Sequence, residues 1–151
     1  MLTKFGVPAE ATPIAGLDRI QNNGNWYWPD PDGQPFVILP AFDSGEVADL
    51  VAFQPHRPMN FKTRTGAVPM LGIDNTATNF GPLRIWRHPL NYLRARLEGV
   101  VILSWGGALP LLACCNEIIA EDVEHGREIR KRLSRPIALP KISVPTKAVQ
   151  R

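Results

Sequence analysis

The pattern of apolar residues changes at Gly66, and this change constrains the fold more than any other feature of the chain. Before Gly66, short β-rich and aromatic runs alternate with clusters of Gly, Pro, Asn and Asp, which is typical of strands joined by turns. After Gly66, short apolar runs alternate with segments of helical periodicity, which favours crossover connections and parallel strands. The sequence therefore predicts a mixed α/β (α+β) fold, in which an antiparallel N-terminal meander is followed by a short βα region with a mixed sheet.

The chain has 151 residues, a length that fits one domain with a substantial core. We expect a loose arm over residues 1–24, with one helical turn near 14–20, and a single mixed α/β domain over 25–133. Residues 134–151 contain three prolines and several cations, and they predict an extended basic tail.

The expected elements follow from local patterns. The meander strands are predicted at 25–28, 36–39, 47–53 and 60–65, and the later strands at 83–86, 99–104 and 117–120. Short helices are predicted over 67–73 and 109–115. A third helix of about three turns is predicted to begin at Pro89, because Leu90, Leu93 and Leu97 would share one face. A fourth is predicted to run to Leu133 after an N-terminal cap at Asp122. Alternation places Trp26 and Trp28 on one face of the hairpin, where they either cap the core or anchor a protein partner.

Positive charge is concentrated in the second half of the chain. Residues 1–82 hold five basic and eight acidic side chains, a net charge of −3, whereas residues 83–151 hold twelve and six, a net charge of +6. Twelve of the seventeen cations are Arg, which pairs through two N–H groups with either phosphate or carboxylate. The second half is therefore the expected surface for a polyanion, either nucleic acid or an acidic protein.

One segment combines cations with aromatic rings, and we select it as the candidate binding surface. Its members are Arg84, Trp86, Arg87, His88, Tyr92, Arg94 and Arg96. If 83–88 is a strand, Arg84, Trp86 and His88 share one face, because side chains alternate along a strand. Aromatic rings between cations suit single-stranded nucleic acid, whose bases stack on the rings while Arg pairs with phosphate. The alternative is that Trp86 packs beneath a helix while the arginines are solvated.

A second candidate cluster lies where the last predicted strand meets the last helix. Its members are Glu121, Asp122, Glu124 and His125, which either share a divalent metal or form an ordinary acidic first turn of a helix. Residues 118–127 resemble the acidic strand-end motif of Toprim domains, with Asp122 and Glu124 at the two acidic positions. This resemblance implies a metal-dependent nucleic-acid-processing enzyme. The second acid is Glu rather than Asp, and the earlier strand ends in Leu103, Ser104 and Trp105 without a Glu.

Residues 49–133 are also similar to small uncharacterised phage and prophage proteins. Our leading hypothesis is an accessory protein of that type, without enzymatic activity or cofactor, and the alternative is the Toprim-like enzyme with its divalent metal. No phosphate loop, dinucleotide fingerprint or nucleophile elbow is present. No apolar run reaches the roughly 20 residues that span a bilayer. The sequence leaves the oligomeric state open.

The two cysteines, Cys114 and Cys115, are adjacent, and they cannot close the long loop from which a structural disulfide gains most of its stabilisation. We therefore expect a cytoplasmic protein in which both are small buried side chains.

Overall fold

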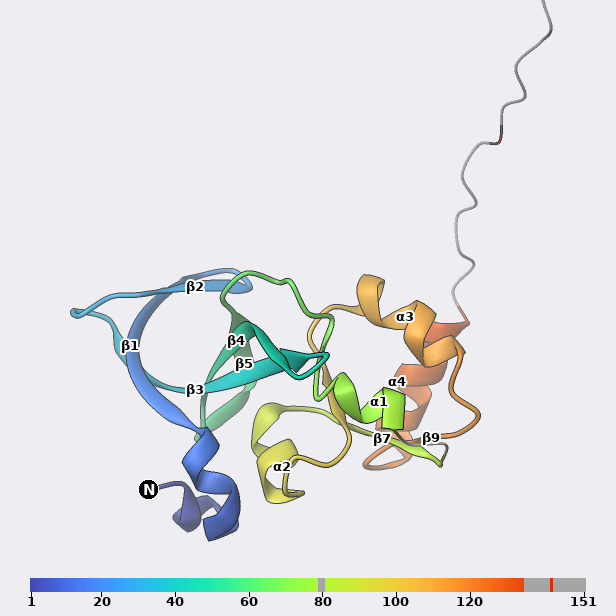
Figure 1. Ribbon diagram of the computed structural model, residues 1–151, viewed down its shortest axis with the longest axis horizontal. Coiled ribbons are helices and arrows are strands. Elements are labelled where there is room, and N and C mark those ends of the chain that lie inside the picture. The colour runs from blue at the N-terminus through green and yellow to red at the C-terminus, as the bar shows by residue number, and fades with distance from the viewer. Residues whose placement is uncertain (79–80, 135–141, 143–151) are drawn as a thin grey trace, which may run out of the picture.

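The N-terminal part of the protein is a closed five-stranded barrel in the computed structural model, which describes residues 1–78, 81–134 and 142 (Figure 1). Its strands are β1 (Gly16–Asn23), β2 (Trp26–Pro29), β3 (Gln34–Asp43), β4 (Glu46–Gln54) and β5 (Arg57–Thr63), closed in the order β1-β2-β5-β4-β3. The pairings are antiparallel except between β2 and β5, which meet in parallel where Trp26 lies opposite Thr63. The predicted strands of the meander are present, but β2 and β3 do not pair with each other.

The strand between them is β1, which was not predicted. The first half of β1 pairs with β3 and its second half pairs with β2, and Ile20 takes part in both registers, opposite Gln34 and Pro29. The expectation of a loose arm with a helical turn at 14–20 is therefore wrong. Pairing with two partners holds these residues extended, although only Ile20 of β1 is buried.

Two tight turns fix the register of the hairpins. Gly24 and Asn25 join β1 to β2, and Gly24 has a φ of 61°, as a two-residue hairpin turn with Gly in first position requires. Ser44 and Gly45 join β3 to β4 with φ values of 54° and 80°, so both central residues are left-handed, as in a type I′ turn. The carboxylate of Asp74 accepts the Ser44 and Gly45 N–H groups at 2.7 and 2.9 Å, which ties this turn to the helix that Asp74 begins.

The second half forms a four-stranded mixed sheet of order β6-β8-β7-β9. Its strands are β6 (Met70–Leu71), β7 (Leu83–Trp86), β8 (Val100–Ile102) and β9 (Ile118–Ile119), and its helices are α1 (Asp74–Thr78), α2 (Pro89–Arg94), α3 (Trp105–Ala113) and α4 (Val123–Leu133). β7 runs parallel to both β8 and β9, while β6 is antiparallel to β8. This arrangement confirms the predicted mixed sheet and the strand–helix alternation from β7 to α4.

Several predicted boundaries shift for local reasons. The segment 67–73 is not a helix: it contains β6, whose Met70 and Leu71 are fully buried opposite β8. α2 ends at Arg94 rather than continuing for three turns, because Arg96 and Leu97 adopt left-handed φ values of 57° and 66°. The predicted tail over 134–151 lies outside the described residues, apart from Ser134 and Ile142.

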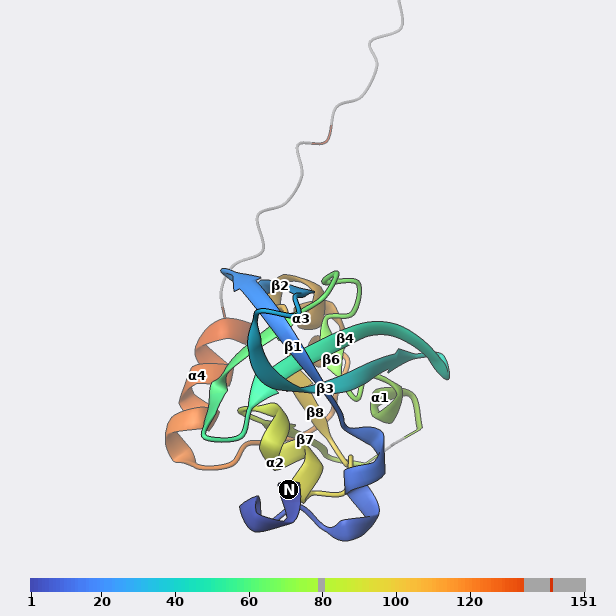
Figure 2. The same ribbon diagram turned by 90° about the vertical axis from the view of Figure 1, so that its left-hand side faces the viewer.

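The core joins the two halves of the molecule. Its largest cluster combines barrel residues such as Val37 and Phe53 with Leu90 and Leu93 of α2 and Val101 of β8. The N-terminal 3-10 helices, η1 (Leu2–Phe5) and η2 (Ala9–Ile14), close the same cluster from below the barrel through Leu2 and Ala11, together with Val7 in the connection between them (Figure 2).

Trp26 and Trp28 do share a face, as predicted, but they are 50% and 41% exposed and do not cap the core, whereas Tyr27 between them points inward. Within residues 1–78, 81–134 and 142, no helix is long and apolar enough to cross a membrane.

Candidate nucleic-acid interface

One face of β7 holds the first Arg–Trp pair of the candidate surface. Leu83 and Ile85 are buried in the second core cluster, and Arg84 and Trp86 project from the opposite face, as the alternation predicts. Arg84 is exposed there, whereas Trp86 is partly buried and packs against the largest core cluster. The Arg84 guanidinium lies 5.2 Å from the centre of the Trp86 ring, within cation–π range. Trp86 Nε1 donates to the Glu98 carbonyl at 2.8 Å, which fixes the ring.

An open hollow of about 570 Å³ lies beside this pair. Its walls include Arg84 and Trp86 from β7, Asn75 from α1, and the chain that follows α2. Gly99, with a φ of 80°, lets this chain approach β7 closely: a Cβ there would come within 2.6 Å of the Arg84 carbonyl oxygen. The close approach keeps the Arg84–Trp86 pair at the rim of the hollow.

Arg87 does not belong to this basic surface, because carboxylates surround its side chain. It pairs with Glu128 at 3.1 Å and Asp122 at 3.2 Å, and its Nε lies 3.9 Å from Glu121. Its backbone N–H also donates to Glu121 at 3.0 Å. Three acidic side chains neutralise this one guanidinium, so its charge is not available to bind an external polyanion. Arg87 is therefore a structural link between β7 and α4.

The remaining predicted residues serve α2 and the N-terminal segment. His88 caps α2, with its Nδ1 accepting the Asn91 N–H at 3.3 Å, and burial lowers its pKa below the ordinary value. Tyr92 is buried in the core. Arg94 donates to the Phe5 carbonyl at 2.7 Å, and Arg96 forms an exposed ion pair with Glu10 at 3.0 Å. The seven predicted residues therefore do not form one surface.

The acidic cluster organises the start of α4. Asp122 caps the helix by accepting the His125 N–H at 2.8 Å, and this bond, with Arg87, holds the pKa of Asp122 below its usual value. Glu121 accepts the Asn91 side-chain N–H at 2.8 Å in addition to its contacts with Arg87, and Glu124 is exposed. Throughout the part of the chain that the structure describes, no three His, Cys, Asp or Glu side chains are grouped to hold a metal ion.

A second Arg–Trp pair, which the sequence did not single out, connects α3 and α4. Trp105 begins α3, and the guanidinium of Arg132, near the end of α4, lies 5.5 Å from the centre of its ring. Trp105 and Trp86 line the same cavity, of about 220 Å³. Nineteen positions separate these tryptophans and 27 separate Trp105 from Arg132, so neither relationship follows from local spacing.

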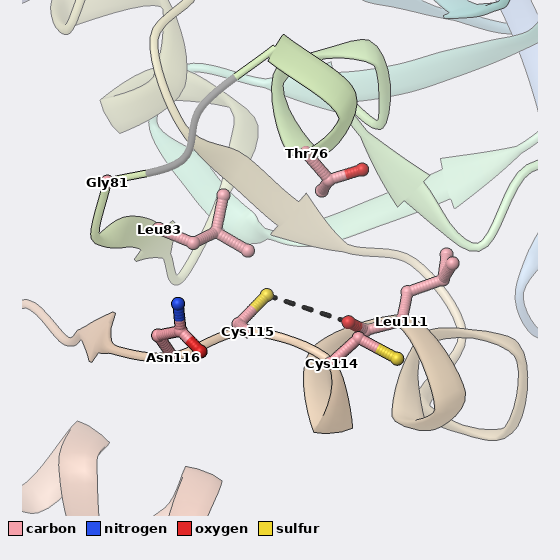
Figure 3. Close-up of a pocket in the computed structure, with 7 residues that line it drawn as sticks. All are labelled: Thr76, Gly81, Leu83, Leu111, Cys114, Cys115 and Asn116. Atoms are coloured by element: carbon pink, nitrogen blue, oxygen red, sulfur yellow. Dashed lines mark hydrogen bonds between the residues drawn. The ribbon is translucent and has the colours of Figure 1, made fainter.

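The cysteines lie in a different hollow, of about 290 Å³, lined by residues of α1, β7 and the end of α3 (Figure 3). Both thiols are free, Cys114 is exposed and Cys115 is partly buried, so the expectation of two buried side chains is wrong. The Cys115 thiol contacts the Leu111 carbonyl at 3.5 Å, and burial raises its pKa, with a smaller contribution from Cys114. A thiol with a raised pKa is a weak nucleophile at neutral pH.

No family model, curated protein or solved structure matches this chain.

Proposed function

We propose that this protein is an accessory protein that binds single-stranded nucleic acid through the two Arg–Trp pairs, Arg84–Trp86 and Arg132–Trp105. One observation carries the proposal: the two tryptophans line one cavity, and each has a guanidinium within 5.5 Å of its ring centre. Aromatic platforms for bases beside cations for phosphates are the elements of single-strand binding.

The charges of the two arginines are available to a ligand. Arg84 and Arg132 are exposed, and within the described ranges neither forms an ion pair with a carboxylate. Arg87, in contrast, is neutralised by its own acidic neighbours. Two phosphate contacts predict a slope of about −1.4 for the logarithm of affinity against the logarithm of salt concentration, at about −0.7 per contact on single strands.

The partial exposure of both rings supports base stacking rather than charge attraction alone. Trp86 and Trp105 are neither buried nor fully exposed, and Trp86 forms part of both the cavity and the adjoining hollow. Stacking of a base on an aromatic ring contributes about 1–3 kcal/mol, or roughly 5- to 150-fold in affinity. The free cysteines favour a cytoplasmic setting, which we include in the proposal.

The test is fluorescence anisotropy of a labelled single-stranded oligonucleotide at several salt concentrations. We expect the Arg84→Ala/Arg132→Ala variant to lose most of the salt slope and Trp105→Ala to lose about 5-fold or more in affinity. The control variant Arg127→Ala/Arg130→Ala removes the same charge from the exposed face of α4 and should retain the slope. Binding that the control weakens as much as the test variant would contradict the proposal.

A parallel titration with poly-glutamate separates nucleic acid from an acidic protein as the ligand. Poly-glutamate has the charge of a polyanion but no base. If it binds as tightly as the oligonucleotide and Trp105→Ala leaves the oligonucleotide affinity unchanged, the surface is a general polyanion or acidic-protein site and the proposal is wrong.

A further inference from the structure

The cavity that Trp86 and Trp105 both line also has apolar and polar lining residues that belong to neither Arg–Trp pair. It opens between the barrel and the second sheet and has a volume of about 220 Å³. Its lining residues are Met59 and Phe61 of β5, Ile85, Trp86, Arg87, Ile102, Trp105, and His125 and Glu128 of α4. Flat apolar walls with a few polar groups are the usual composition of a small-molecule site.

His125 contributes a hydrogen-bond donor, its Nε2–H group, to this cavity. The residue is only 5% exposed, and its Nδ1 accepts the backbone N–H of Glu121 at 3.1 Å. A neutral imidazole whose Nδ1 accepts must have its proton on Nε2, so Nε2 is a hydrogen-bond donor. Within the described residues this N–H has no acceptor, although His125 lines the cavity.

The two charged side chains that line the cavity neutralise each other, so they offer no unpaired charge to a ligand. Arg87 and Glu128 both line it, but they pair with each other at 3.1 Å, and Arg87 also contacts Asp122. The cavity is also smaller than the 300–1,000 Å³ typical of sites for drug-sized ligands. A fitting ligand is therefore a single uncharged planar group that carries a hydrogen-bond acceptor.

We propose that this cavity, which Trp86 and Trp105 both line, binds one unstacked nucleobase, which accepts a hydrogen bond from His125 Nε2. Nucleobases are planar and uncharged, and every base has ring or carbonyl acceptors on its edges. This inference rests on the proposed function, since it names the group that the single strand inserts between the two Arg–Trp pairs. It makes His125 a binding residue, separate from the arginines that contact phosphate.

The test uses free nucleosides, which have bases but no phosphate, titrated by calorimetry and by the NMR signals of the His125 ring. We expect saturable binding that does not depend on salt and that shifts the His125 signals. In His125→Asn, the Asn side-chain oxygen can still accept the Glu121 N–H, but the Nε2 donor is lost. We therefore expect this variant to fold and to bind nucleosides about 2- to 10-fold more weakly, the effect of one hydrogen bond.

His88→Asn is the matched control, because His88 Nδ1 also accepts a backbone N–H but His88 does not line the cavity. It should bind nucleosides like the wild type. Met59→Trp is a second test variant that does not alter His125: Met59 is 59% exposed at the cavity and accepts a larger side chain there without core disruption. A bulky ring at this position should block nucleoside binding.

The results distinguish this inference from the function on which it rests. If the oligonucleotide binds with the predicted salt slope but nucleosides do not, or if His125→Asn and Met59→Trp bind nucleosides like the wild type, the nucleobase pocket is wrong and the proposed function stands. If nucleosides bind and both variants weaken them while the oligonucleotide does not bind, the pocket stands and the single-strand function is wrong.

Discussion

The buried carboxylate of Asp49 accepts the backbone N–H of Thr65 at 2.9 Å, and this bond joins β4 to the chain that leaves the barrel after β5. The same side chain also accepts the N–H groups of Leu50 at 2.8 Å and Ala67 at 3.1 Å. One acidic side chain therefore fixes the path of the backbone from the barrel toward β6.

Replacement of Asp49 by Ala should destabilise the protein by about 3 kcal/mol, because hydrogen bonds to a charged group contribute roughly 1.5–3 kcal/mol each and are not additive. Asp49→Asn keeps an acceptor oxygen and should cost less. Urea unfolding measures both values. The control is Asp18→Ala: Asp18 is exposed, and among the described residues its side chain accepts the neighbouring Arg19 N–H alone, so a change within about 0.5 kcal/mol is expected. Equal losses for Asp49→Ala and Asp18→Ala would contradict the role given to Asp49.

Val7 tests whether the N-terminal segment belongs to the core. It is only 3% exposed and packs in the largest core cluster. Val7→Ala removes two buried methyl groups and should cost about 2 kcal/mol, at about 0.8 kcal/mol per buried carbon plus a cavity contribution. Val47→Ala makes the same chemical change at a side chain that is 56% exposed and should leave the melting temperature nearly unchanged. If both variants melt like the wild type, residues 1–15 are not part of the folded core.

Gly33 lies against the point where β1 changes partner. A Cβ at this position would come within 2.2 Å of the Ile20 carbonyl oxygen, and backbone atoms cannot move away as a flexible side chain can. We expect Gly33→Ala to destabilise the barrel by about 2 kcal/mol, as overpacking does. Among the described residues, and apart from its chain neighbours and the backbone of its own helix, Gly106 in α3 has no heavy atom within 4 Å of its Cβ position. Gly106→Ala should therefore stabilise the protein by up to about 1 kcal/mol through helix propensity. Thermal unfolding of both variants should show shifts of opposite sign.

The pKa of His125 should lie below its ordinary value of about 6.5 in the folded protein. Burial is the largest cause and Arg87 adds to it, while the nearby carboxylates of Glu121, Glu128 and Asp122 oppose them. Because the folded pKa is lowered, the unfolded chain binds a proton first as the pH falls. The stability that neutral His125 provides is therefore complete above pH 6.5 and declines as the pH falls from there toward the folded pKa.

Two measurements check this pH dependence. An NMR titration of the His125 ring should give a midpoint below 6.5. Urea unfolding at pH 7.5 and pH 5.5 should show that wild type loses more stability than His125→Asn, whose side chain does not titrate. A midpoint above 6.5, or equal losses in the two proteins, would show that the imidazole is not held neutral by burial.

Local sequence signals were sufficient where an element depends on its own residues. The alternation in Leu83, Arg84, Ile85 and Trp86 predicted both the bounds of β7 and its exposed face. Asp122 was predicted as a helix cap because its side chain acts on a backbone group only three residues away.

β1 was missed although a signal for it was present. Gly24 and Asn25 form a Gly-Asn dipeptide that is typical of a hairpin turn, but the strand before it has no apolar alternation, since Ile20 is the one buried residue of β1. Its extended conformation results from pairing with two strands, β2 and β3, that come later in the chain.

By itself the sequence determined the fold class, the order of elements in the βα region and the presence of an Arg84–Trp86 face on β7. The tertiary structure decided which cations remain available, since the carboxylates that neutralise Arg87 lie 34 or more positions away in the chain. It also decided that Trp86, Trp105 and His125 share one cavity, which forms where β5, β7, α3 and α4 pack together. Residue spacing predicts which side chains share a face of one element, whereas contacts between elements depend on how the whole core packs.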